Sequence, residues 1–178
     1  MISSGEKKAL SIIAAVVVVF VVVVATSVFL LTRNSDKEHE PYLHIAVGSD
    51  LYTVEPARWC DLFLEKCAPA ADQPQRPTPR VPVPVGETIL LTVSAEIAES
   101  PWRLQTVYWV PGAGIDEDED TFDAGTTHSV PLRSTPEKIL VGITVLPPSG
   151  VFIGDNVTYD RGVLTADTSP ADFQQIVD

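Results

Sequence analysis

An acidic run forms the densest group of potential ligands in this chain. The five residues that begin at Asp116 read Asp-Glu-Asp-Glu-Asp. Hard cations prefer carboxylate oxygens, and Asp116, Asp118 and Asp120 alternate as the first ligands of a calcium-binding loop do. The match then ends, because such a loop needs a glycine and a bidentate glutamate where this chain has Thr121 and Thr127.

Electrostatic repulsion governs how this acidic segment is interpreted. Adjacent carboxylates repel one another, which favours a solvated, mobile loop over residues 116–123, between two strands. We assign no metal site, and Asp116, Asp118 and Asp120 are only weak candidate ligands. The two alternatives are a docking surface for a basic partner and a site for a small cation.

Cys60 and Cys67 are the only cysteines. In an exported domain, an even number of cysteines indicates a disulfide. Metal-binding and redox pairs are typically separated by two residues, whereas six residues separate this pair. The sequence therefore predicts a structural disulfide between Cys60 and Cys67.

The chain offers little that could carry out catalysis. His39, His44 and His128 are its only histidines, and no two of them have the spacing of metal ligands. The sequence also lacks a Gly-x-Ser-x-Gly elbow, a phosphate-binding glycine loop and a His-Glu-x-x-His motif. We predict that the protein is not an enzyme and uses no cofactor.

The net charge of −12 excludes one class of partner. Binding to nucleic acid needs a basic surface against the phosphate backbone, and this chain is strongly acidic. The same excess of carboxylates argues against docking on anionic lipid through a basic patch.

An uncharged and mostly apolar stretch covers residues 9–32. As a helix, Leu10–Leu31 would be about 33 Å long, enough to cross a hydrocarbon core of about 30 Å. We predict one transmembrane helix over 9–32, in the cell membrane, with residues 1–8 in the cytoplasm and the C-terminal domain outside. The alternative is a signal peptide cleaved near Ala25, although the apolar run continues to Leu31.

Three further segments follow this stretch. We interpret residues 33–40 as a short polar tether, 41–168 as one extracytoplasmic domain, and 169–178 as a C-terminal tail. Six prolines fall within 69–84, so this segment is extended and cannot be a central strand. We favour a long Pro-rich loop inside one domain, and the alternative is a linker between two domains.

Short segments rich in Val, Ile, Thr and aromatic residues, bounded by Gly, Pro or Asp, predict about seven strands. These segments are 42–47, 51–55, 88–94, 102–110, 127–132, 139–146 and 157–165. Only residues 95–99 have a helical pattern. Many short strands with few helices indicate a mostly β fold, and we predict an immunoglobulin-like antiparallel β-sandwich.

The strand at 102–110 carries a large aromatic load. Because side chains alternate across a strand, one face carries Trp102, Leu104, Thr106 and Tyr108, which we assign to the core. Trp109 has the opposite parity, so it points outward or contacts a partner.

With these motifs, the chain resembles an uncharacterised family of actinobacterial exported proteins, known as a domain of unknown function. The motifs that carry the resemblance are the apolar segment 9–32, the hairpin 42–56, Cys60 with Cys67, and the Trp-x-Leu-x-x-x-Tyr strand of Trp102, Leu104 and Tyr108. The resemblance implies no catalytic residues. In architecture, the chain also resembles accessory subunits of the actinobacterial respiratory supercomplex that joins cytochrome bc1 and cytochrome oxidase.

These observations favour a non-enzymatic, membrane-anchored interaction module, which would be an accessory subunit of a respiratory or cell-envelope complex. Its expected partners are an integral membrane protein complex and, through its one helix, membrane lipid. Ala14 and Ala25 are candidate helix contacts because small residues allow close packing, and Trp109 is a candidate contact of the domain. The alternative is an extracytoplasmic protein that binds a small ligand or cation through residues 116–123.

Overall fold

The computed structural model describes residues 16–29, 41–153 and 157–177. The chain divides into two units, Met1–His39 and Glu40–Asp178, which are described separately. In the first unit, residues 16–29 form an α-helix. The hydroxyls of Thr26 and Ser27 donate hydrogen bonds to the carbonyl oxygens one turn earlier, at 2.7 and 2.8 Å, so both polar groups are satisfied within the helix.

No helix in the described part of the chain combines the length and the apolar character that crossing a membrane requires. Residues 9–15 and 30–32 of the predicted transmembrane segment, the tether 33–40, and residues 1–8 lie outside the described residues.

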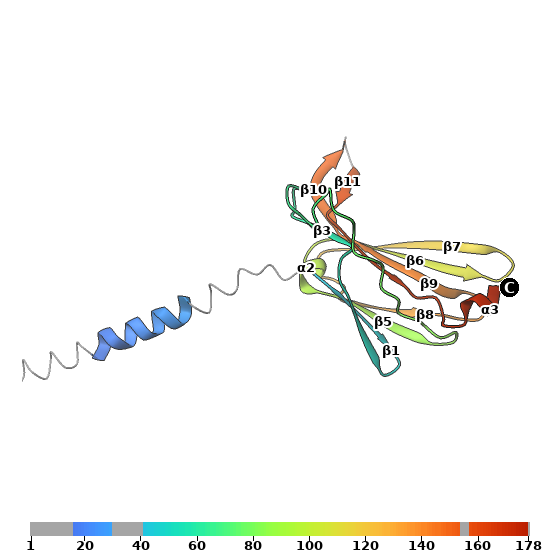
Figure 1. Ribbon diagram of the computed structural model, residues 1–178, viewed down its shortest axis with the longest axis horizontal. Helices are drawn as coiled ribbons and strands as arrows, with labels where there is room; N and C mark the ends of the chain where they lie inside the picture. Colours follow the sequence, from blue (N-terminus) through green and yellow to red (C-terminus); the bar gives the residue numbers. More distant parts are fainter. Residues whose placement is uncertain (1–15, 30–40, 154–156, 178) are drawn as a thin grey trace, which may run out of the picture. The chain divides into compact units, whose positions relative to one another are not determined.

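The second unit is built mainly from antiparallel strands, as predicted (Figure 1). A four-stranded sheet has the order β2-β1-β5-β8, and a six-stranded sheet has the order β4-β3-β12-β9-β6-β7. The first comprises β1 (Leu43–Val47), β2 (Asp50–Val54), β5 (Thr88–Val93) and β8 (Ser129–Arg133). The second comprises β3 (Arg58–Cys60), β4 (Cys67–Ala68), β6 (Trp102–Val110), β7 (Gly114–Phe122), β9 (Ile139–Leu146) and β12 (Gly162–Asp167).

The remaining elements are a hairpin and two short helices. The hairpin pairs β10 (Pro148–Ile153) with β11 (Val157–Asp160). The helices are α2 (Ala95–Ala98), which was predicted at 95–99, and α3 (Phe173–Val177) in the C-terminal tail. The strand predicted at 157–165 is divided between β11 and β12, because Arg161 separates two different pairings.

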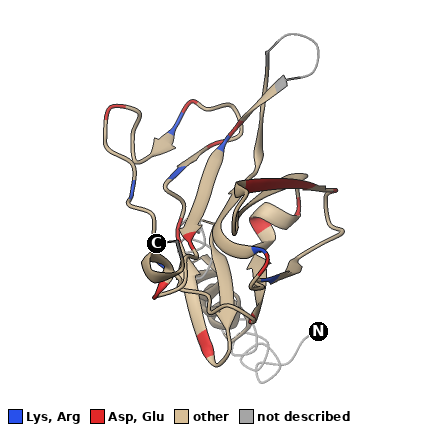
Figure 2. Ribbon diagram, turned by 90° about the vertical axis from the view of Figure 1, so that its right-hand side faces the viewer, with Lys and Arg blue, Asp and Glu red and all other residues tan. Residues whose placement is uncertain are grey.

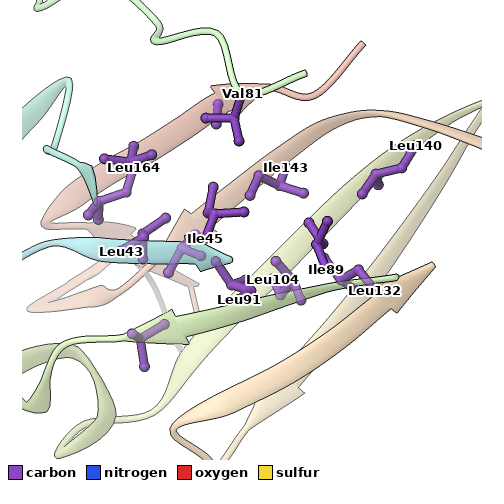
Figure 3. Close-up of a cluster of buried hydrophobic side chains, with 14 of the residues drawn as sticks. Leu43, Ile45, Val81, Ile89, Leu91, Leu104, Leu132, Leu140, Ile143 and Leu164 are labelled. Atoms are coloured by element: carbon purple, nitrogen blue, oxygen red, sulfur yellow. The ribbon is translucent and has the colours of Figure 1, made fainter. Parts of the chain in front are cut away.

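The core lies between the two sheets, where alternate residues of each strand point inward (Figure 3). Leu43 and Ile45 of β1 and Ile89 and Leu91 of β5 are fully buried. In β6, the whole predicted core face is buried, as the parity of the sequence indicated. That face consists of Trp102, Leu104, Thr106 and Tyr108.

The Pro-rich segment contributes to this core. The amides of Val81 and Val83 donate to the carbonyl oxygens of Asp167 and Thr168, at 2.8 and 3.1 Å, and both valine side chains are buried. Prolines occupy positions 82 and 84, which are the alternate positions along this extended piece. The segment therefore lines the end of β12 without needing the amides that proline lacks.

The described chain enters the second unit at Pro41, at one end of the two sheets. We call it the Pro41 end. The Ser94 amide, just before α2, donates to the Tyr42 carbonyl, and the Ala57 amide donates to the Val163 carbonyl. Figure 1 shows α2, β3, β10 and β11 at this same end of the sheets.

Candidate functional site

The acidic segment is a β-strand and not the loop that the sequence predicted. Residues 114–122 form β7, the outermost strand of the six-stranded sheet, paired along its length with β6 (Figure 2). The prediction was wrong because repulsion between neighbouring carboxylates is reduced when they alternate between two faces. At a sheet edge all five also remain exposed to water, where charged side chains commonly protect an unpaired edge.

The row made by Asp116, Asp118 and Asp120 lies on the same side of the sheet as the buried face of β6. Lys138 neutralises part of it, with its Nζ 2.6 Å from Asp118 Oδ2 and 2.9 Å from Asp116 Oδ2. The same ammonium group lies 4.5 Å from the centre of the Tyr108 ring. The hydrogen bonds that Lys138 donates to Asp118 and Asp116 raise the pKa of Lys138, whereas burial raises the pKa of Tyr108.

The opposite face of the strand carries a second polar network. Gln105 Nε2 donates a 2.8 Å hydrogen bond to Glu119, and Arg103 lies 3.5 Å from the same carboxylate. Arg103 also donates to both carboxylate oxygens of Asp160, at 2.8 and 2.9 Å. The bond from Gln105 is the largest cause of the lowered pKa of Glu119, and the Asp160 pair raises the pKa of Arg103.

The three aspartates do not converge on a point. Alternate residues of a strand lie about 6.6–6.8 Å apart, so Asp116, Asp118 and Asp120 are spread along the sheet edge. Lys138 already contacts two of them. Within the described residues, no group of three or more His, Cys, Asp or Glu side chains is placed to hold a metal ion.

Shallow grooves lie on the surface of the described part of the second unit. A groove of about 230 Å³ lies over the β6–β7 hairpin and is lined by Gln105, Val107, Glu117, Asp118 and Glu119. A larger groove of about 430 Å³ lies beside the β1–β2 turn, Pro82, Pro84 and the start of the C-terminal tail. Both grooves have carboxylates among their lining residues.

The predicted partner contacts have different surroundings. Trp109 is half-buried on the outer face of β6, and its ring makes an edge contact with Phe173 of α3, 6.3 Å between centroids. Ala25 is exposed in the helix of residues 16–29, and Ala14 lies outside the described residues.

The predicted disulfide between Cys60 and Cys67 is present, and it joins opposite residues of β3 and β4. His44 is half-buried beside the ring of Tyr42, 4.6 Å between centroids, and His128 is exposed before β8. The sheet also brings together a polar row that the sequence did not reveal, because His44 is opposite Thr92 and Thr92 is opposite Ser129. Only the pairing of three strands makes these residues neighbours.

Comparison with known proteins places the chain in a family. The sequence profile described as protein of unknown function, DUF2771, matches residues 36–158. The chain belongs to the DUF2771 family. No curated protein and no solved structure matches the chain.

The DUF2771 match extends from β1 through the start of β11, so it includes the disulfide, the buried face of β6 and the acidic strand β7. It begins after the apolar stretch 9–32. The match therefore covers the strands from β1 to β10 and the start of β11, whereas β12 and α3 lie beyond it.

Proposed function

We propose that the protein is a non-enzymatic, membrane-anchored interaction module that serves as an accessory subunit of a larger membrane complex. In this proposal, residues 9–32 cross the cell membrane, the N-terminus is cytoplasmic, and the sandwich is extracytoplasmic. The partner is an integral membrane assembly, either a respiratory complex such as the actinobacterial cytochrome bc1–oxidase supercomplex or an assembly of the cell envelope.

The order of the strands supports an immunoglobulin-like plan for this module. Such sandwiches place strands A, B and E in one sheet and strands G, F and C in the other, with C′ added in variable-type domains. The orders β1-β5-β8 and β12-β9-β6-β7 follow that arrangement in chain order. Trp102, fully buried at the start of β6, lies on the strand that would be C.

The acidic edge strand is the observation that carries the proposal. Its five carboxylates are held at regular spacing by pairing with β6, and Lys138, Gln105 and Arg103 orient Asp118, Asp116 and Glu119. Glu117 and Asp120 remain exposed. A rigid surface with fixed charges suits a basic protein surface, because less conformational entropy is lost when it binds.

The test is recovery of a complex from native membranes by crosslinking and mild detergent. The full chain should migrate well above its monomer mass with a crosslinked partner. Replacing Glu117 by Gln and Asp120 by Asn should reduce that recovery. The matched control replaces Glu55 by Gln and Asp72 by Asn, two exposed carboxylates outside β7, and should retain it. Migration as a monomer with no crosslinked partner would defeat the proposal.

The anchor can be tested separately by alkaline carbonate extraction of membranes. An integral helix keeps the full chain in the membrane pellet, whereas a peripheral protein is released. Release of the intact chain would contradict a membrane span at 9–32.

The groove over β6 and β7 favours one alternative, an extracytoplasmic protein that binds a small ligand or cation. Titration calorimetry of the full chain in detergent with Ca²⁺ tests the cation case. Binding heat that disappears when Asp116, Asp118 and Asp120 are all replaced by Asn would support this alternative. The same titration curve for the parent and the triple variant would exclude cation binding by these three aspartates.

A further inference from the structure

A group of exposed apolar side chains lies at the Pro41 end of the sandwich. Two belong to the loop between Cys60 and Cys67, and two belong to the β10–β11 hairpin. They are Leu62, Phe63, Phe152 and Tyr159, whose exposed fractions are 46, 64, 68 and 52%. We call these four residues the apolar tip.

Contacts between the loop and β10 fix these two segments against each other. The Gly150 amide of β10 donates a 2.7 Å hydrogen bond to the Leu62 carbonyl. A Cβ placed on Gly150 would lie 3.2 Å from Leu62 Cγ and 3.5 Å from Phe63 Cε1, so both side chains rest against the strand. The disulfide closes the base of the loop, and the Arg103–Asp160 pair attaches the base of the hairpin to β6. The apolar tip is therefore supported by the sandwich.

The local charge differs from that of the chain as a whole. Segments 58–68 and 147–161 contain three basic residues, Arg58, Lys66 and Arg161, and four acidic ones, Asp61, Glu65, Asp155 and Asp160. Three minus four gives −1, against −12 for the whole chain. Of the twelve Lys and Arg residues, four precede residue 41, and three of the remaining eight lie in these two segments. The two segments that carry the apolar tip thus hold little of the excess negative charge that would repel a lipid surface.

The length of chain before the sandwich indicates that the apolar tip faces a membrane. If residues 9–32 span the membrane, as in the proposed function, only residues 33–40 separate the span from Pro41. Eight residues reach at most about 28 Å. Ser94 and Tyr42 are hydrogen-bonded at the same end as β3 and the hairpin, so this short connection leads to the end that carries the apolar tip.

We propose that the apolar tip inserts into the lipid–water interface of the membrane that holds the N-terminal segment. Phenylalanine, leucine and tyrosine are suited to this depth, because their apolar bodies leave water and the tyrosine hydroxyl stays hydrated. The contact would fix the tilt of the sandwich and direct β7, along the sheet edge, toward a neighbouring protein. This inference rests on the proposed membrane anchor.

The test uses the full chain in phosphatidylcholine vesicles, with the native disulfide intact. An environment-sensitive fluorophore is attached to a cysteine introduced at Phe152 or, as a second position, at Tyr159. The matched control is the same label at Ile115, which is 58% exposed. Ile115 lies beside the β6–β7 turn, at the end of this hairpin away from the Pro41 end. The vesicles are prepared with and without spin-labelled phosphatidylcholine, which quenches only fluorophores that reach the lipid.

Labels at 152 and 159 should show blue-shifted emission, and spin-labelled phosphatidylcholine should quench most of that emission. The label at 115 should show neither the blue shift nor the quenching. Equal and weak quenching at all three positions overturns the inference if alkaline carbonate does not extract the protein from the vesicles, because the anchor is then intact. A blue shift at 152 without quenching overturns it in favour of a protein contact. Strong quenching at 115 as well would show that the sandwich does not insert through this end. Release by carbonate would instead overturn the proposed anchor, and the inference with it.

Discussion

At the scale of single residues, the Trp59 side chain leaves room only for glycine at position 162. The two are opposite each other in β12 and β3, and a Cβ on Gly162 would overlap the indole ring. Arg161 lies over the same ring, 4.2 Å from its centre. Any larger residue must displace this stack.

We therefore expect Gly162→Ala to cost about 1–3 kcal/mol of unfolding free energy, through overpacking. Urea denaturation monitored by tryptophan fluorescence measures it. The control is Gly142→Ala in β9, where the added Cβ would lie 3.5 Å from Val107, an ordinary contact. That change should stay within about 0.5 kcal/mol. Equal losses at both positions would contradict the packing argument.

A second residue-scale prediction concerns Glu119. The hydrogen bond from Gln105 lowers the pKa of Glu119, so Gln105→Leu should raise that pKa toward the ordinary glutamate range. With a lowered folded-state pKa, the stabilisation is present above the unfolded pKa and is lost as pH falls through the folded value. NMR titration of the Glu119 carboxylate measures the shift directly. Gln75→Leu, an exposed change elsewhere, should leave it unaltered, and an unmoved Glu119 in the Gln105 variant would refute the cause.

At the scale of elements, the Pro-rich segment is a structural part of the sandwich. Val81 and Val83 are buried, whereas Pro82 between them is half-buried. Val81→Ala removes two buried carbon groups and should cost roughly 2 kcal/mol, judged by chemical denaturation. Pro82→Ala keeps the same backbone path and should cost much less. A Val81 variant as stable as the parent would mean that this segment is dispensable to the core.

The disulfide-closed loop is the second element with a measurable role. Loop-entropy arguments give about 2.5 kcal/mol for closing so short a segment. The protein unfolded without reductant should contain no reactive thiol, and reduction should lower its melting temperature. Replacing both Cys60 and Cys67 by Ala should make the melting temperature insensitive to reductant. Two titratable thiols in freshly purified protein would rule out the bridge.

At the scale of the whole molecule, charge governs behaviour in solution. The chain has 24 acidic and 12 basic residues, with an isoelectric point of about 4.5. At neutral pH the copies repel one another, and protonation of carboxylates removes that repulsion. Turbidity of the full chain in mild detergent should therefore peak near pH 4.5. Neutralising Glu55 and Asp72 together should move the peak to higher pH. A flat profile across the acid range would contradict this.

The sequence alone determined the strands whose hydrophobic pattern is local and strong. Burial alternates over the eight positions 102–109, and the shared face of Trp102, Leu104, Thr106 and Tyr108 followed from the two-residue period of a strand. The disulfide followed from having two cysteines and no other pairing to choose. The mostly β class followed from many short apolar segments with few helical ones.

Tertiary structure decided the features that depend on a distant partner. The run at 116–120 is a strand because β6 pairs with it and because Lys138, far along the chain, lies between two of its carboxylates. The repulsion among the carboxylates of 116–120, judged from the sequence of that segment alone, does not include the positive charge of Lys138. Val81 is a core residue because its amide finds the carbonyl of Asp167, 86 positions later. The apolar tip likewise arises only where the loop at Leu62 meets β10. Local patterns specify which face of an element is apolar, whereas the positions of charges and the neighbours of loops depend on contacts that only the folded chain makes.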